Sequence, residues 1–104
     1  MMEELKSDEP YEVAAGCPTI TFELADGSLM LGYSSFASGQ FKSGKIELGF
    51  QDWRIEIEGD NLTEVWRLLQ MQDLRAVRLS IEGIADRSRA CRISLITVER
   101  SSER

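Results

Sequence analysis

Residues 53–72 read WRIEIEGDNLTEVWRLLQMQ and join two different periodicities. The first six residues alternate apolar and charged side chains, which is the pattern of a half-buried strand. Beyond Gly59, four apolar residues recur at helical spacing and define one face of a helix: Leu62, Val65, Trp66 and Leu69. We therefore predict a strand that ends in a turn at Gly59, followed by one short helix over about 61–72 that packs through Trp66.

The start of this helix carries a capping signal. Asn61 is a good N-cap residue because its side-chain oxygen accepts a hydrogen bond from a free helical N–H group. Glu64 follows three residues later, where it reaches back to the cap as in a capping box. A helix of about 11 residues is marginal alone in water, so packing must hold it against the rest of the chain.

Residues 19–34 predict a β-hairpin around Asp26-Gly27, a dipeptide typical of a type I′ turn. A two-residue loop at these positions sets the register of the flanking strands. In that register the apolar residues meet on one face: Ile20 with Tyr33, Phe22 with Leu31, and Leu24 with Leu29. The turn chemistry and the alternation therefore agree.

Residues 45–58 predict a second hairpin around Gln51-Asp52. Its apolar face matches Ile46, Leu48 and Phe50 with Ile57, Ile55 and Trp53. The other face then places Glu47 opposite Glu56, with Glu58 on the same side. Paired carboxylates suit glycoside hydrolysis or metal binding.

Two basic residues, Lys45 and Arg54, share this face and neutralise part of its charge. A solvated acidic face is therefore the favoured interpretation over a catalytic pair. Its glutamates Glu47, Glu56 and Glu58 are candidate partner-binding residues.

Between the hairpins, residues 34–45 lack periodicity and predict a long Gly/Ser-rich loop that carries Phe36 and Phe41. Its Gly-x4-Gly-Lys spacing matches a phosphate-binding loop. However, Ile46 stands where Ser or Thr must hold magnesium, and a strand pattern follows instead of a helix. Two interpretations of the rings stay open: a mobile loop presents them to a partner, or both pack back onto the core.

After the helix, residues 75–82 alternate as a further half-buried strand, and residues 83–90 form a polar loop. The last strand pattern, Cys91–Val98, has apolar residues on both faces: Cys91, Ile93 and Leu95 on one, Ile96 and Val98 on the other. A strand buried on both sides is central in a sheet or lies at an interface. This strand is our reason to expect a homodimer.

These elements predict an α+β fold. It consists of a mainly antiparallel sheet or partly open barrel of about six strands, with the short helix between the fourth and fifth strands and packed on one face. A helix between strands also permits one parallel pairing. Residues 1–12 predict an acidic, flexible tail, residues 13–98 a single globular domain, and residues 99–104 a polar C-terminal tail.

The composition limits the chemistry. The 104 residues carry a net charge of −6 and include no histidine and only two cysteines, Cys17 and Cys91. The chain therefore lacks the commonest general base and zinc ligand, and its isolated cysteines predict free thiols rather than a disulfide framework or zinc site. We expect no catalytic site, no cofactor and no metal. The polar, acidic N-terminus differs from a signal peptide, so a cytoplasmic location and no membrane contact are expected.

One group of basic residues stands out against the acidic composition. Arg87, Arg89 and Arg92 flank one loop and suit bidentate binding of a phosphate or carboxylate group. Because carboxylates outnumber basic residues, pairing with the protein's own glutamates is the favoured interpretation.

Three functions stay open. The leading hypothesis is a non-catalytic cytoplasmic interaction or structural module that forms a homodimer. The alternative is a small acidic inhibitor, of the kind found in immunity proteins, that neutralises a basic partner. The third is a weak phosphate or nucleic-acid binder that uses Arg87, Arg89 and Arg92.

Overall fold

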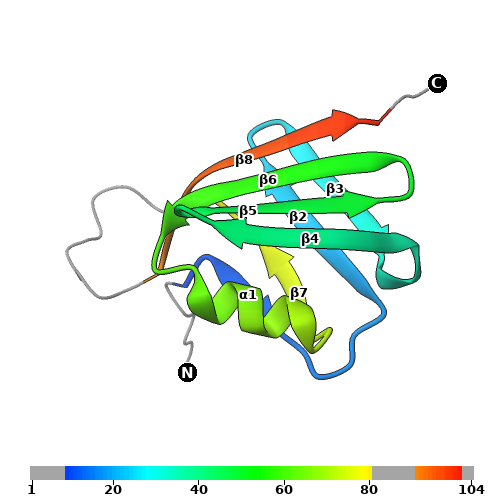
Figure 1. The fold of residues 1–104 in the computed structure, drawn as a ribbon, viewed down its shortest axis with the longest axis horizontal. Coiled ribbons are helices and arrows are strands. Elements are labelled where there is room, and N and C mark those ends of the chain that lie inside the picture. Colours follow the sequence, from blue (N-terminus) through cyan, green and yellow to red (C-terminus); the bar gives the residue numbers. More distant parts are fainter. Residues whose placement is uncertain (1–8, 81–90, 102–104) are drawn as a thin grey trace, which may run out of the picture.

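The computed structural model describes residues 9–80 and 91–101, which form two four-stranded sheets and one α-helix (Figure 1). The first sheet has the strand order β1 (Tyr11–Val13), β7 (Leu74–Val77), β2 (Thr19–Leu24), β3 (Gly27–Gly32). The second sheet has the order β4 (Phe36–Lys42), β5 (Lys45–Phe50), β6 (Trp53–Asp60), β8 (Arg92–Arg100). A 3₁₀ turn, η1 (Tyr33–Ser35), joins β3 to β4, and α1 (Thr63–Gln70) joins β6 to β7.

The predicted α+β fold with mainly antiparallel sheets is confirmed, since every pairing in the second sheet is antiparallel. The parallel pairing that the sequence permits joins β2 to β7. The strand count and the helix position are wrong. The described residues form eight strands in two sheets that do not close into a barrel, and α1 follows β6 because β1 and β4 were not expected.

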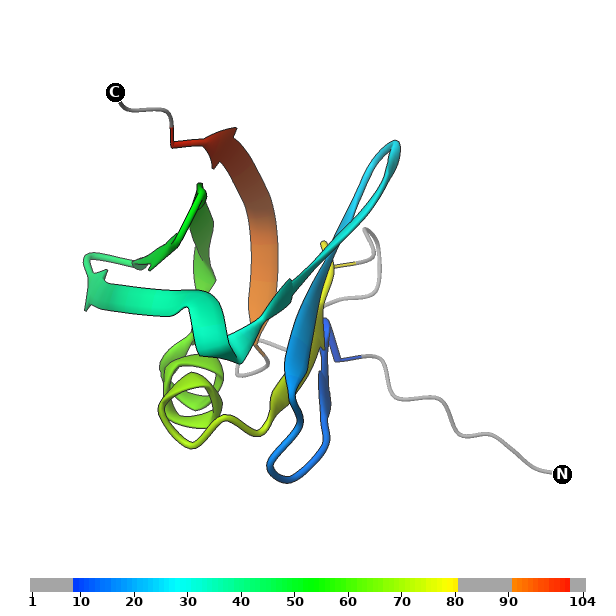
Figure 2. The same ribbon diagram turned by 90° about the vertical axis from the view of Figure 1, so that its right-hand side faces the viewer.

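The core fills the space between the two sheets, which Figure 2 shows as separate layers. The rings of Phe22 and Phe50 meet edge to face across these layers, with centroids 6.2 Å apart. In both views α1 lies beside β4 and close to β7, and its buried residues Val65, Leu68 and Leu69 join the same core. The helix therefore packs between two sheets rather than on one face of a single sheet.

The β2–β3 hairpin forms, but in a different register from the predicted one. Leu24 pairs with Gly27, so the turn residues are Ala25 and Asp26. Neither has the positive φ that a type I′ turn requires. Gly27 instead begins β3 with a φ of +154°, which few residues other than glycine adopt. The difference of two residues keeps each apolar side chain on its predicted face.

The predicted loop at residues 34–45 is wrong, because most of it is the strand β4. Ser43 and Gly44 have φ values of 56° and 74° and close the β4–β5 hairpin between Lys42 and Lys45. Positive φ at both positions is typical of a type I′ turn. The Gly-Lys pair that resembles a phosphate-binding loop therefore belongs to this hairpin turn.

The β5–β6 hairpin has the predicted register. Phe50 pairs with Trp53 beside the Gln51-Asp52 turn, and Glu47 pairs with Glu56. This register holds because alternate residues of both strands are fully buried, which leaves little freedom to slip.

The helix is shorter than expected and begins differently. Asn61 has a φ of 56°, a left-handed conformation that asparagine tolerates better than most residues, and turns the chain from β6 into α1. The N-cap residue is Leu62, which makes no side-chain capping bond, and Glu64 accepts a 3.1 Å hydrogen bond from Arg67 Nε instead of capping. The predicted capping box is therefore wrong.

The backbone groups at the C-terminal end of α1 have hydrogen-bond partners. Gln72 has a φ of 61°, its N–H donates to the carbonyl of Leu69, and the N–H of Asp73 donates to that of Leu68. These are the bonds of a Schellman motif. Gln72 and Asp73 also bond to residues 14–17, which fixes the helix end against the β1–β2 connection.

The last strand is not central, since β8 lies at an edge of its sheet, and its two faces are not both buried within one chain. Gly59 pairs with Ile93 and Glu58 pairs with Leu95, so Ser94 is an extra residue in a β-bulge. The bulge shifts the alternation by one residue. Ile93, Ile96 and Val98 consequently pack on the core, while Leu95 is 46% exposed.

The sequence predicts that the strand ends at Gly59, but β6 continues to Asp60. Gly59 instead makes this bulge possible. A Cβ at Gly59 would lie 1.9 Å from the carbonyl oxygen of Arg92, far inside any real contact. Only glycine lets β8 approach β6 this closely.

The tail boundaries also shift. Tyr11 and Glu12 lie in β1, where Tyr11 pairs with Val77, because the ring of Tyr11 packs against the core. At the other end β8 extends to Arg100. The strand predicted at 75–82 is described only as β7, which ends at Val77, and residues 1–8, 81–90 and 102–104 lie outside the described residues.

Candidate functional site

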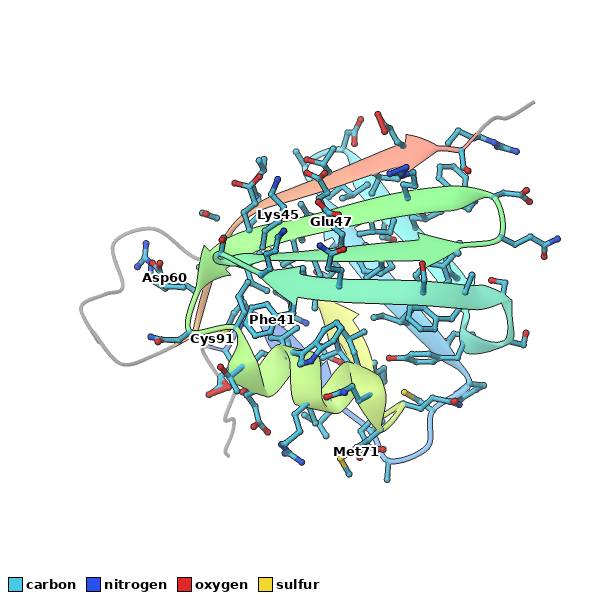
Figure 3. All side chains as sticks on the ribbon, in the orientation of Figure 1. Phe41, Lys45, Glu47, Asp60, Met71 and Cys91 are labelled. Atoms are coloured by element: carbon cyan, nitrogen blue, oxygen red, sulfur yellow. The ribbon has the colours of Figure 1, made fainter. Side chains whose placement is uncertain are left out.

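The face of the second sheet that points away from the first sheet carries three rows of side chains across all four strands. Paired residues share a face and alternate residues along a strand do too, so the register defines the rows. They are Ser38, Gly49, Arg54 and Glu99; Gln40, Glu47, Glu56 and Thr97; and Lys42, Lys45, Glu58 and Leu95. We call this surface the outer face. Figure 3 shows Lys45 and Glu47 on it, on the side that faces the viewer.

The outer face is hollowed into an open groove of about 560 Å³ that is lined by residues from all four strands. Gly49 lies in the middle of the groove between Ser38 and Arg54 and offers only backbone there. Neighbouring strands lie about 4.8 Å apart, so the groove crosses about 14 Å of sheet.

Carboxylates dominate the charged lining of the groove. Glu47, Glu56 and Glu99 line it together with one guanidinium, that of Arg54. Glu56 makes a loose ion pair with Lys45 at 3.8 Å, and both side chains remain about 40% exposed. Among the residues that the structure describes, no ion pair within 4.0 Å involves Glu47 or Glu99.

The structure brings the three predicted glutamates together on this face, with Glu58 in the row beside Glu56. The sequence did not reveal the contributions of β4 and β8, which are Ser38, Gln40, Thr97 and Glu99. The sequence feature that could have revealed β4 is Ser43-Gly44, which forms the turn of the β4–β5 hairpin. The last strand was predicted, but the residues of β8 that share the outer face were not, because the bulge interrupts the alternation.

The two candidate aromatic residues pack against neighbouring rings. The Phe41 ring lies 5.7 Å from that of Trp66, and the Phe36 ring meets Phe50 edge to face at 5.3 Å. Gly39 leaves room for the rings of Phe36 and Trp66, since a Cβ there would lie 3.3 Å from both. The interpretation in which the rings pack onto the core therefore holds for Phe41, while Phe36 remains 39% exposed.

The arginine cluster is not assembled in the described residues. Arg92 is exposed at the start of β8, where it pairs with Asp60, while Arg87 and Arg89 lie outside the described residues. Two further arginines of this half of the chain, Arg75 and Arg78, bind the protein's own carboxylates.

Both cysteines are free thiols, as the sequence predicts. Cys91 lies close to Asp60 (Figure 3), and burial, with smaller contributions from the carboxylates of Glu9 and Asp60, raises the pKa of its thiol to about 11. Such a thiol stays protonated at neutral pH and is a poor nucleophile. Burial also raises the pKa of the Tyr33 phenol, which donates a 2.6 Å hydrogen bond to the carbonyl of Leu74.

Within residues 9–80 and 91–101, no three His, Cys, Asp or Glu side chains are placed to hold a metal ion. The same residues include no helix with the length and apolar character of a membrane span. Comparison with known proteins found no matching family model, no matching curated protein and no matching solved structure.

Proposed function

We propose that this protein is a non-catalytic interaction module that binds an extended basic segment of a partner protein across the outer face of the second sheet. The observation that carries the proposal is the groove, which is lined by the carboxylates of Glu47, Glu56 and Glu99 and has no side chain at Gly49, between Ser38 and Arg54. The proposal joins the interaction module and the acidic inhibitor that the sequence left open.

The dimensions of the groove suit a polypeptide. An extended chain rises about 3.3 Å per residue, so about four residues cross the four strands. The lining has three carboxylates against one guanidinium, and this surplus favours lysine and arginine side chains in the partner. A backbone floor at Gly49 lets the partner's main chain approach closely.

Binding explains this surface better than catalysis does. A general acid–base pair works in a site that excludes water and holds a substrate in place. The pair Glu47 and Glu56 instead lies on an open sheet face, where the Glu56 side chain is 40% exposed. A phosphate or nucleic-acid site receives less support, because of its three predicted arginines only Arg92 lies among the residues that the structure describes.

The test is a titration with a fluorescein-labelled peptide of alternating lysine and serine, followed by fluorescence anisotropy. We expect this peptide to bind, a matched glutamate–serine peptide not to bind, and the affinity to fall with added salt. The double variant Glu47→Gln/Glu56→Gln should weaken binding about twofold to thirtyfold, since exposed charge pairs contribute about 0.2–1 kcal/mol each.

The matched control removes two charges elsewhere, at Asp26 in the β2–β3 turn and Glu64 on α1. The variant Asp26→Asn/Glu64→Gln has the same net charge as the groove variant and should bind the basic peptide almost as the wild type does. Equal losses in both double variants would contradict the proposal, because binding would then depend on net charge alone. Equal binding of the two peptides would also contradict it, because the carboxylates of the groove would then not select a basic partner.

A further inference from the structure

The two sheets have four edge strands, and three of them are protected. β1 has only three residues. β3 begins and ends with glycine, which weakens strand pairing. β4 has an irregular register near its start and lies beside α1. Short strands, glycines, irregularities and covering helices are the usual ways in which proteins protect a sheet edge from other chains.

The fourth edge, β8, has a β-bulge at Ser94 near its start, but beyond this bulge the described residues give it none of these protections. At Ile93 the edge is occupied, since Ile93 N–H donates to Ser80 Oγ at 2.8 Å and Ser80 N–H donates to the Ile93 carbonyl at 2.9 Å. Beyond Ile93, the described part of the chain places no strand beside residues 94–100 on the side away from β6.

The composition of this free edge favours strand pairing. Residues 94–100 read SLITVER and contain three β-branched residues, no proline and no lysine. β-branched residues are enriched in strands, whereas proline and lysine are the residues that most often block an exposed edge. The charged residues Glu99 and Arg100 lie only at its end.

We propose that a second copy of this chain pairs antiparallel with residues 94–100, with the two-fold axis at Thr97. Thr97 is the midpoint of the free edge, so this register uses the whole edge and satisfies the isologous contact of a two-fold dimer. On the core side, Ile96 of one copy lies opposite Val98 of the other. On the outer face, Thr97 lies opposite Thr97, and Leu95 lies opposite Glu99.

These cross-strand pairs are compatible in character. Ile96 and Val98 already pack on the core, so their pairing continues an apolar face across the dimer. Leu95, 46% exposed in one copy, gains cover from the hydrocarbon part of Glu99. The second sheet of each copy joins that of the other to form one eight-stranded sheet. The two grooves then meet at the dimer axis, because Thr97 and Glu99 line each groove. The proposal is independent of what the groove binds.

The test measures mass by size-exclusion chromatography with light scattering, without any ligand. We expect the wild type to show twice the 11.8 kDa of one chain and to dissociate on dilution. A basic variant, Thr97→Lys/Glu99→Lys, and an acidic variant, Leu95→Glu/Thr97→Glu, each place like charges across the axis. Each should dissociate at a concentration at least about tenfold higher than the wild type.

An equimolar mixture of the two variants should restore the dimer. In this register the lysines introduced at positions 97 and 99 of one copy meet the glutamates introduced at positions 97 and 95 of the other. The control variant Ser38→Lys/Gln40→Lys adds charge to the same outer face on β4 and should keep the wild-type mass. Amide hydrogen exchange of the wild type provides a second measurement that needs no variant: protection of residues 94–100 should increase with protein concentration.

A wild type with the mass of one chain at every concentration would overturn the proposal. So would charged variants that keep the wild-type mass, a mixture that stays monomeric, or protection of residues 94–100 that is independent of concentration.

Discussion

The charged side chains on the outer surfaces of the two sheets differ in the ion pairs that they form within the chain. On the first sheet, Arg78 binds both Glu12 and Glu23, and Arg75 lies 3.6 Å from Glu12. On the second sheet, the described residues include a single ion pair on the outer face, the 3.8 Å contact of Lys45 with Glu56. The first surface thus joins separate segments of the chain through its charges, whereas most carboxylates on the second form no ion pair among the described residues.

The charges of the first sheet fix the start of the chain. Arg78 N–H donates to the Pro10 carbonyl at 2.9 Å, and the Arg78 guanidinium bonds to the Glu9 carbonyl at 3.3 Å. Burial alone would lower the pKa of Arg78, but hydrogen bonds with Glu23 and Glu12 outweigh it and raise this pKa. Among the described residues, the outer face of the second sheet has no comparable network of ion pairs and hydrogen bonds, and Gly59 allows the close approach of β6 and β8 at the bulge.

The largest expected effect comes from Gly59→Ala. Its Cβ would overlap the Arg92 carbonyl, and this neighbour is backbone, which cannot move aside as a side chain does. We expect a loss of about 3 kcal/mol in the free energy of unfolding, measured by urea denaturation. If the bulge holds the second sheet in shape, amides of β8 should also exchange faster while those of β2 keep their protection.

The matched control is Gly49→Ala in the same sheet. The only tight contact of its Cβ would be with the Ser38 hydroxyl at 3.1 Å, the end of a side chain that can rotate, while the Ser38 carbonyl oxygen lies at an ordinary 3.9 Å. We expect a change of less than about 1 kcal/mol. Equal losses for the two variants would show that the close approach of β6 and β8 is not the reason for glycine at position 59.

A smaller effect distinguishes the ion pairs of the two surfaces. Arg78→Ala should cost about 1–2 kcal/mol, because it removes a network of bonds to Glu12, Glu23 and the chain at Glu9. Lys45→Ala should cost less than about 0.5 kcal/mol, as an isolated exposed pair does. Urea denaturation of both variants checks the difference, and a larger loss for Lys45→Ala would reverse the comparison of the two surfaces.

A further expected effect is a pH dependence at the junction between the N-terminal segment and the second sheet. Burial raises the pKa of Cys91 from an ordinary 9.0 to about 11. The folded state therefore binds this proton more tightly than the unfolded state, and the resulting stability is present below pH 9 and lost as the pH rises through 11. Burial raises the pKa of Tyr11 and Tyr33 as well, which adds to the loss at the highest pH.

The free energy of unfolding should consequently fall between about pH 9 and 11, and it should fall less steeply in Cys91→Ser. Urea titrations of both proteins across this range measure the two slopes. Identical slopes would show that the Cys91 thiol is as accessible to water in the folded state as in the unfolded one.

The second hairpin shows which features of this fold can be predicted from the sequence. Ile46, Leu48, Ile55 and Ile57 are all buried and face one another, so alternation alone fixed the register. In the first hairpin, the type I′ preference of Asp26-Gly27 misled the prediction, because glycine can also satisfy an unusual φ just after a turn. Local turn chemistry was therefore a weaker guide than the pattern of buried residues.

The missed elements depend on contacts between segments far apart in the sequence. β4 lacks an apolar alternation because Gly39 occupies a core-facing position that the ring of Trp66 fills from α1. The apolar character of both faces of β8 comes from the bulge opposite Gly59. Of the predicted glutamates, Glu47 and Glu56 line the groove, whereas its members on β4 and β8 were not predicted: Ser38, Gln40, Thr97 and Glu99.

The most direct test of the central claim is an NMR titration of the ¹⁵N-labelled protein with the lysine–serine peptide. If the outer face of the second sheet is the binding surface, the largest amide shift changes should occur at Glu47, Gly49, Arg54 and Thr97. Amides on the outer surface of the first sheet, such as those of Thr21 and Met30, should keep their positions. Changes concentrated on the first sheet, or spread evenly over both surfaces, would contradict the account.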